Sequence, residues 1–245
     1  MKLARNTLLV ATLATLAVPA AFAQGVNLYW NDCGGGTNAA INQTFACDTN
    51  VGDPLVMFLS VVSPYEVPQF VAVEASVDVL VSGGSLPPWW QLGAGQCRDG
   101  AMRATCDPNE FGTPACPDIW DGAQPISVYQ VTSAPVTWAF RFRFAAAVQY
   151  PSPISTAEVG QELVVGLVRV TRDKSTGPGA CDGCLAGACF VAEQVKLMQP
   201  AGLGDLLLTS PATNNWVQLN GGIGWQNCYV PNVNRTWGAI KTLYR

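Results

Sequence analysis

The sequence predicts an all-β protein built as an antiparallel β-sandwich. Eight segments have the length and residue pattern of β-strands, turn-rich stretches separate them, and no long helical period lies between them. Only 12% of the 245 residues are charged, while Gly and Pro number 24 and 17. Long amphipathic helices need many charged side chains on their solvent face, so the composition also disfavours a helical protein.

The composition excludes several other classes. A chain that is 49% hydrophobic buries enough surface to offset its ordering entropy, so it is not intrinsically disordered. It contains no His. This excludes a Ser-His-Asp triad, a Cys-His dyad and any zinc site that needs imidazole. No pattern indicates a cofactor.

Residues 1–23 read as a signal peptide. Lys2 and Arg5 form a short basic region, an uncharged apolar run follows, and Ala21-Phe22-Ala23 supplies the small residues that a signal peptidase reads. The run from Leu8 to Val18 is shorter than the roughly 20 apolar residues that span a bilayer. A retained membrane anchor is the alternative interpretation.

Cleavage after Ala23 would start the mature chain at Gln24. It would remove both basic residues of the leader, leaving 11 basic and 17 acidic side chains and a net charge of −6. An acidic domain without a basic stripe is a poor nucleic-acid binder. The mature part has no further run of spanning length, so we expect export to the periplasm, the cell surface or the medium.

Two of the expected strands have a strict period of two. Between residues 71 and 81 valine and alanine alternate with Ala72, Glu74 and Asp78, and between 136 and 146 aromatic side chains alternate with Arg141 and Arg143. Shorter strands are predicted at 26–31, 55–62, 126–132, 163–172, 189–198 and 206–209.

Residues 24–235 of the mature chain are expected to form one β-sandwich domain. The longest irregular stretch, residues 87–124, contains three cysteines and is better interpreted as a pinned loop than as a domain boundary. In residues 236–245, Trp237, Ile240 and Tyr244 have a spacing that fits a short helix after Thr236. We expect this C-terminal helix or strand to dock on the sandwich. The alternative is a tail that export or surface-attachment machinery reads.

All nine cysteines lie in the mature part, where an oxidising compartment favours disulfides. The pairs closest in sequence are Cys33 with Cys47, then two of Cys97, Cys106 and Cys116. Because nine is odd, one thiol stays free or pairs between chains, and Cys106 is the candidate since its neighbours bracket it. The disulfide candidates are therefore Cys33, Cys47, Cys97, Cys116, Cys181, Cys184, Cys189 and Cys228.

The third cysteine cluster has two interpretations. Cys181, Cys184 and Cys189 could pair among themselves, or one of them could reach Cys228. The stretch Cys181-Asp182-Gly183-Cys184 could also form a metal or redox site. A cysteine-only zinc site needs four thiolates, however, and an oxidising compartment disfavours it, so structural disulfides are preferred and no metal is expected.

Several short stretches of the mature chain carry a family resemblance. They are Asn31-Asp32-Cys33-Gly34, Phe45-Ala46-Cys47, Leu86-Pro87-Pro88-Trp89-Trp90, Cys97-Arg98, Gly179-Ala180-Cys181-Asp182-Gly183-Cys184, Cys189 and Asn234-Arg235-Thr236-Trp237-Gly238. In these stretches the chain resembles a group of uncharacterised secreted bacterial β-sandwich proteins with a tail similar to NRTWGxxKxLYR. The resemblance covers nearly the whole mature chain and implies no known activity. At the level of the fold alone, the chain is similar to cohesin-like and carbohydrate-binding sandwiches, or to a jelly roll.

Without His, paired carboxylates are the available general acid–base groups. Glu74 and Asp78 lie on one face of a predicted strand, with backbones about 13 Å apart, which is wide even for an inverting glycosidase. A solvated surface is the simpler interpretation of this pair.

Trp89 and Trp90 are the candidate ligand-binding residues. They follow Pro87-Pro88, a rigid stretch that could hold an indole exposed for a sugar ring or another chain. Burial as a lid on the core is the alternative. The sequence thus predicts a secreted, non-catalytic binding module for an extracellular protein or a glycan. A structural cell-envelope subunit whose tail docks on a neighbour, and a glycan-active hydrolase using Glu74 and Asp78, are the alternatives.

Overall fold

A computed structural model describes residues 24–134, 136–149, 154–156, 159–222 and Cys228. The expected leader, the segment 236–245 and two of the eight tryptophans, Trp225 and Trp237, lie outside this range. None of the helices in the described part of the chain has the length and hydropathy of a membrane span.

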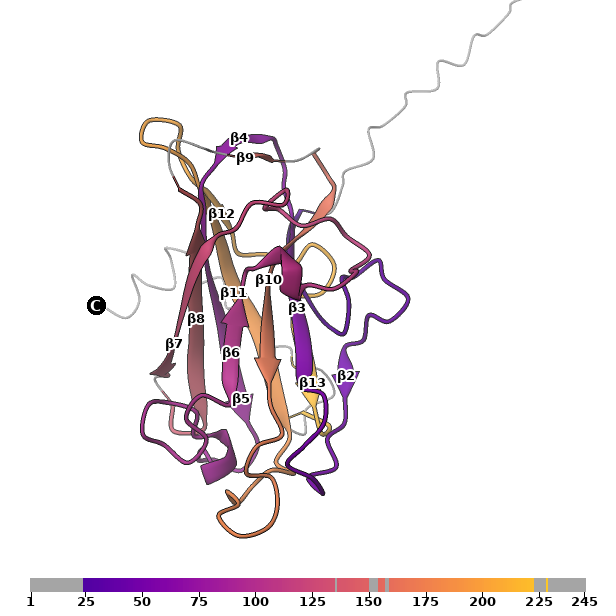
Figure 1. Ribbon diagram of the computed structural model, residues 1–245, viewed down its shortest axis with the longest axis vertical. Coiled ribbons are helices and arrows are strands. Elements are labelled where there is room, and N and C mark those ends of the chain that lie inside the picture. Colours follow the sequence, from indigo (N-terminus) through magenta and orange to yellow (C-terminus); the bar gives the residue numbers. More distant parts are fainter. Residues whose placement is uncertain (1–23, 135, 150–153, 157–158, 223–227, 229–245) are drawn as a thin grey trace, which may run out of the picture.

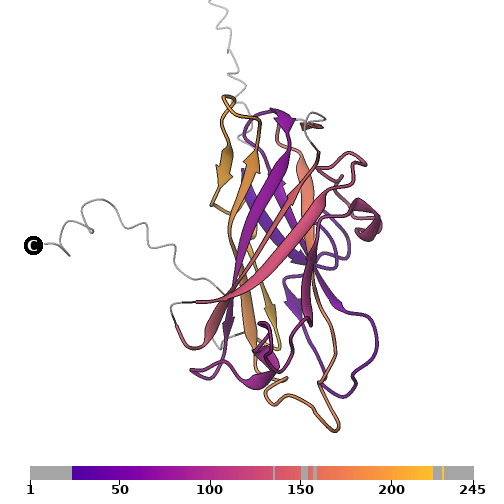
Figure 2. The same cartoon turned by 60° about the vertical axis from the view of Figure 1, so that its left-hand side comes forward.

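The described chain is an antiparallel β-sandwich, as the alternating patterns predicted. One sheet has four strands in the order β1-β3-β10-β6: Gly25–Trp30, Leu55–Val62, Glu162–Val170 and Met102–Thr105. The facing sheet has the order β2-β13-β11-β5-β8-β7: Asn42–Gln43, Trp216–Leu219, Ala188–Met198, Ala72–Val81, Ala139–Ala147 and Ile126–Ser133. Here β12 (Leu206–Leu208) pairs with β11, and β4 (Val67–Phe70) pairs separately with β9 (Ile154–Thr156). Figures 1 and 2 show the two layers from different sides.

The core lies between the two sheets. The inner face of β5 carries Val77 and Val79, and the inner face of β8 carries Phe142 and Phe144, all buried. Trp30 at the end of β1 meets Phe190 of β11 edge to face, with ring centroids 5.4 Å apart, so this contact joins the two sheets directly.

The strands at 55–62, 71–81 and 126–132 match the predicted segments within one residue. The strand predicted from residue 136 instead begins at Ala139, because the backbone N–H of Ala139 closes a turn by donating to the carbonyl of Val136. The five short strands β2, β4, β6, β9 and β13 were not predicted, and β6 lies inside the stretch predicted to be a loop.

Four disulfides join segments far apart in the sequence, and they use the eight predicted cysteines. The bonds are Cys33–Cys116, Cys47–Cys184, Cys97–Cys181 and Cys189–Cys228. Cys106 is free and buried, as predicted.

The expected pairing of cysteines nearest in sequence is wrong, because the sandwich brings together loops that are 83, 137 and 84 residues apart in the first three bonds. Cys189 does reach Cys228, one of the two options for the third cluster. Cys181 and Cys184 each bond to a distant partner, so the metal or redox site at this pair is wrong as well.

Candidate binding surface at the edge strand β7

Trp89 and Trp90 do not form the exposed contact face that the sequence predicted. They lie in a 3-10 helix (Pro88–Trp90), and both are fully buried. Trp89 Nε1 donates to Ser175 Oγ over 3.1 Å, and Trp90 Nε1 donates to the Ala186 carbonyl over 3.3 Å. Buried indoles whose N–H groups have partners in the core stabilise the loops around them, which is the alternative stated for these residues.

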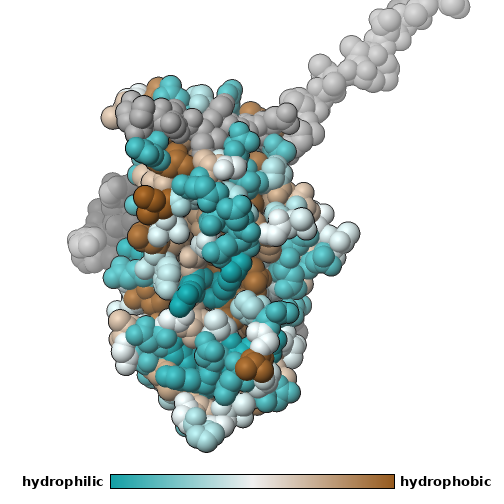
Figure 3. Space-filling model, in the orientation of Figure 1, coloured by the Kyte–Doolittle hydropathy of each residue, from teal (hydrophilic) through white to brown (hydrophobic). Residues whose placement is uncertain are grey.

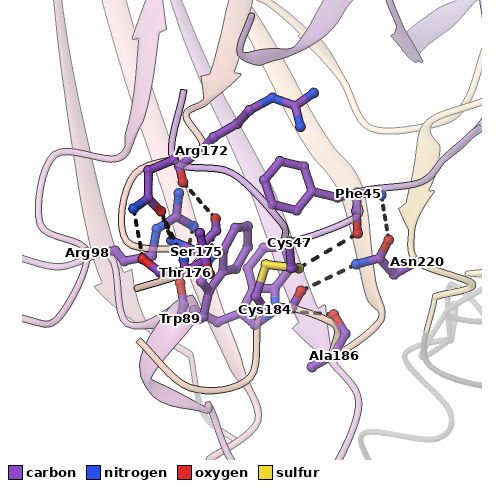
Figure 4. Close-up of a disulfide and its surroundings, with 12 residues drawn as sticks. Phe45, Cys47, Trp89, Arg98, Arg172, Ser175, Thr176, Cys184, Ala186 and Asn220 are labelled. Carbon is purple, nitrogen blue, oxygen red and sulfur yellow. Dashed lines mark hydrogen bonds between the residues drawn. A yellow bond between two sulfur atoms is a disulfide. The ribbon is translucent and has the colours of Figure 1, made fainter. Parts of the chain in front are cut away.

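The surroundings of Trp89 explain its burial. Figure 4 shows Trp89, Phe45 and Arg98 grouped around the Cys47–Cys184 disulfide. The Phe45 and Trp89 ring centroids are 5.5 Å apart, and the Arg98 guanidinium carbon lies 3.6 Å from the Trp89 ring centroid. The sequence contains these residues in order but does not show that they converge.

Glu74 and Asp78 share the outer face of β5 but do not form a catalytic pair. Asp78 is held by Arg141 of β8, with Nε–Oδ1 and Nη2–Oδ2 distances of 2.5 and 2.6 Å. Glu74 lines a depression in which Asp78 has no part. The two carboxylates therefore do not face a common cleft, and this geometry does not support the hydrolase alternative.

The depression beside Glu74 has a volume of about 630 Å³ and lies on the outer face of the larger sheet. Four adjacent strands contribute its lining, which includes Glu74 and Ser76 of β5, Gln194 of β11, Arg143 and Ala145 of β8, and Val128 and Gln130 of β7. It combines one acidic and one basic side chain with amide and apolar groups. A lining that mixes charged, polar and apolar groups in this way could contact the side chains of another polypeptide.

The charged groups next to this depression have perturbed pKa values. The hydrogen bond from Arg141 to Asp78 raises the pKa of the guanidinium, although burial opposes this. Burial and, secondly, the Asp78 carboxylate raise the pKa of Glu193, while Arg141 lowers it. Glu193 stands where the pairing of β11 with β5 shifts register, between Ala192 and Gln194.

The most exposed apolar side chains of the sheet belong to β7. Its first five residues are all exposed, and Ile126, Val128 and Tyr129 are 82%, 65% and 42% exposed. Figure 3 shows hydrophobic side chains gathered on the left side of the molecule, where Figure 1 places β7 and β8. Isolated exposed apolar residues are ordinary, but a consecutive exposed run on a strand is a feature of interaction sites.

Among the described strands, β7 pairs only with β8, so no strand is hydrogen-bonded to its second edge, although β6 at the edge of the facing sheet lies close to β7. An unpaired edge presents backbone N–H and C=O groups that can pair with another chain, and proteins usually protect such edges with charge, proline or cover. β7 has none of these internal protections: its eight residues include no charge, Pro or Gly, and no charged residue occurs from Gly122 to Phe140.

The strands β1, β2 and β6, which end the two main strand orders, differ from β7. The edge of β1 is covered, because Val26 and Leu28 donate their backbone N–H groups to the carbonyls of Ser210 and Asn214. β2 has only two residues. β6 has four residues and carries the exposed Arg103. Among these edges, β7 thus combines length, exposure and neutrality.

A second depression, of about 340 Å³, adjoins the other end of β7. Leu86 and Leu92 line one side, and Val131, Thr132 and Ser133 of β7 line the other, with Trp90 in the buried wall. β7 therefore runs between two depressions. We call β7 together with these depressions the β7 edge surface.

Sequence reasoning located this strand but did not single it out as a candidate binding surface. The pattern ISVYQVTS places apolar residues on both faces, Ile126 and Val128 on one and Tyr129 and Val131 on the other. An uncharged run of this kind is the available signal, although a fully buried strand has the same pattern.

No family model matches the chain, and no curated protein matches it. Among solved structures, it is similar to the second type II cohesin module of the cellulosomal adaptor ScaA scaffoldin of Acetivibrio cellulolyticus. The match has 7% identity and a TM-score of 0.31, and it covers 77% of this chain and 98% of the cohesin chain. A likeness at this level carries no information about activity or partner.

Proposed function

We propose that this chain is a secreted, non-catalytic binding module that takes a protein partner by strand addition along β7. The observation that carries the proposal is the run of five exposed residues on an uncharged edge strand. In strand addition, an extended partner segment gains affinity from main-chain hydrogen bonds and specificity from pockets for alternate side chains. The depression at the Val131–Ser133 end of β7 is a candidate for such a pocket.

The disulfides support the extracellular part of the proposal. Four disulfides in one chain are typical of proteins that fold in an oxidising compartment. Two of them, Cys47–Cys184 and Cys97–Cys181, also tie together the loops around Trp89.

A protein partner is favoured over a glycan by the state of the aromatic residues. The indole offers the largest flat face for stacking on a sugar ring, and none of the six tryptophans in the described part of the chain is exposed, although Tyr65 and Tyr129 are 51% and 42% exposed. Exposed apolar residues on an open strand edge match an extended polypeptide instead.

The test is selection of peptides from a phage-displayed random library on the immobilised full mature chain. We expect the selected peptides to slow amide exchange in residues 126–133, and Val128→Lys with Tyr129→Lys to weaken binding at least about tenfold. The matched control is Val51→Lys, because Val51 is 75% exposed and lies on a loop away from β7. Peptides that bind without protecting β7, or equally well to the double variant, would contradict the proposal.

A further inference from the structure

We infer that the depression on the outer face of the larger sheet binds a zwitterionic ligand, an amino acid or short peptide that carries both an ammonium group and a carboxylate. The inference goes beyond the proposed function, because the site lies on the face of the sheet and does not depend on the open edge of β7. It adds a second binding site and the chemical class of its ligand.

A row of polar side chains crosses the depression. The strand register gives the row in the order Gln130 of β7, Arg143 of β8, Ser76 of β5 and Gln194 of β11. Neighbouring strands lie about 4.8 Å apart, so the row spans about 14 Å. Each of the four side chains can donate a hydrogen bond, and the row is therefore suited to the oxygen atoms of a carboxylate.

The adjacent row supplies the hollow and a charge of the opposite sign. It lies about 7 Å away, two residues along each strand, and places Ala145 opposite Glu74. The two charged side chains, Arg143 and Glu74, thus occupy one diagonal of a block of four residues. The small side chains of Ser76 and Ala145 occupy the other diagonal, so the floor between the charges is low.

Glu74 and Arg143 lack the partners that neighbouring charges on this face have. Asp78 holds Arg141, and Lys196, which lies opposite Glu74, forms an ion pair with Asp205 at 2.7 Å. Within the part of the chain that the structure describes, Glu74 and Arg143 make no ion pair and no side-chain hydrogen bond, either with each other or with a third residue. Two opposite charges therefore face one depression without a partner.

The hydroxyl of Ser76 is a further unpartnered group in the floor. Ser76 is only 5% exposed, yet no described residue forms a hydrogen bond with its side chain. Native proteins rarely leave a buried polar group unsatisfied. Its oxygen is not sealed from solvent, in contrast to Asp118 Oδ1 and Arg169 Nε, so a ligand in the depression can reach it.

These groups select a ligand that has both charges. A ligand with a single charge would leave either Glu74 or Arg143 uncompensated, whereas a zwitterion pairs with both and matches a lining of one acidic and one basic side chain. Arg143 would bind the carboxylate with two parallel hydrogen bonds, Ser76 would donate a third, and Glu74 would accept from the ammonium group. The volume of about 630 Å³ lies in the range of small-molecule sites.

The probes are alanine, dialanine and trialanine, in which the distance between the ammonium group and the carboxylate increases stepwise. Titration of the isotope-labelled full mature chain, followed by amide NMR shifts, measures each dissociation constant. We expect millimolar values, because such small ligands offer few atoms for contact. The shifts should centre on residues 74–76, 128–130, 143–145 and 194. The length that binds most tightly shows whether the ligand is a free amino acid or a short peptide.

Blocked dialanines are the matched ligand controls. N-acetyl-dialanine lacks the ammonium group and dialanine amide lacks the carboxylate, so each should bind at least about fivefold more weakly than dialanine. Glu74→Gln and Arg143→Gln should each weaken dialanine binding by a similar factor. Glu66→Gln and Arg103→Gln should not, because these exposed charges lie away from the depression.

The decisive arm combines variants with blocked ligands. Glu74→Gln should abolish the preference for a free ammonium group while the preference for a free carboxylate remains, and Arg143→Gln should do the reverse. Loss of folding cannot produce that exchange of selectivity. The inference would be overturned by an absence of shifts at about 50 mM of all three probes, by equal binding of blocked and free dialanine, or by shifts confined to other surfaces.

The outcomes separate this inference from the proposed function. If zwitterions do not bind but selected peptides still protect β7, the site on the sheet face is wrong and strand addition stands. If dialanine binds as expected and no selected peptide protects β7, strand addition is wrong and this site stands.

Discussion

The guanidinium carbon of Arg98 lies 3.6 Å from the centroid of the Trp89 ring, and both side chains are fully buried. Arg98 donates to three backbone carbonyls, those of Trp89, Thr171 and Asp173. Burial lowers its pKa to about 10, so it remains charged at neutral pH. One side chain thus joins the loop that carries Trp89 to the loop after β10.

Arg98→Lys should lower the free energy of unfolding by about 2 kcal/mol. A lysine ammonium cannot reproduce the planar stacking on Trp89 or reach three carbonyls that are arranged around a guanidinium. Arg103→Lys is the matched control, because Arg103 is exposed on β6 and should change stability by less than about 0.5 kcal/mol. Urea unfolding of both variants measures the difference, and equal midpoints would contradict this role of Arg98.

Peptide mapping of the unreduced protein should recover four cross-linked pairs, Cys33–Cys116, Cys47–Cys184, Cys97–Cys181 and Cys189–Cys228. The fold places these sulfur atoms together even though their sequence separations reach 137 residues. Mass spectrometry of proteolytic fragments identifies each pair. Recovery of a Cys33–Cys47 fragment would contradict the arrangement of the loops.

Cys106 should resist alkylation in the folded protein. Burial raises its thiol pKa to about 12, which lowers its thiolate fraction near pH 8.5 by about a thousandfold relative to an ordinary cysteine. We expect iodoacetamide to modify no thiol of the native chain and one thiol per chain in guanidinium chloride. Rapid native modification at Cys106, located by fragment mass, would show that the core around it is open.

Glu193→Gln should stabilise the fold at neutral pH. Its pKa is raised by burial and then by Asp78, so the folded chain holds this proton more tightly than the unfolded chain. Stability therefore falls as the pH rises from the ordinary carboxyl range through the raised pKa, and the penalty is complete above it. The variant should raise the melting temperature at pH 7 by an amount equivalent to less than about 1 kcal/mol, since the site is half-open to solvent.

The same variant should give little or no gain below about pH 4, where the carboxyl is protonated in both states. Glu74→Gln serves as the comparison on the same sheet face, because Glu74 is exposed. A melting-temperature gain that is constant from pH 4 to pH 7 would show that the raised pKa is not its cause.

The strands were predictable wherever one face of the sheet is buried and the other is wet. The alternation of apolar and polar residues predicted the bounds of β5 within one residue. It was visible because Val77 and Val79 enter the core while Glu74 and Asp78 face outward. Short strands such as β13 hold too few residues for a period to be visible.

Long-range packing was not predictable from the sequence. The burial of Trp89 depends on Ser175, which is 86 residues away and becomes a neighbour only after folding. The edge position of β7 was hidden for a related reason. A period of two shows that Val128 points to one face, but only the strand order shows that no described strand follows β7 in its sheet. Edge strands are defined by topology, which no local pattern contains.

Amide hydrogen exchange along β7 tests most directly whether this edge is open. In the chain without a bound peptide, alternate amides of residues 126–130 should exchange almost without protection because they point away from β8, whereas those of β5 should be strongly protected. With a bound peptide, the same alternate amides should slow together. Uniform protection of β7 in the free chain would mean that the edge is already covered, and it would contradict the account.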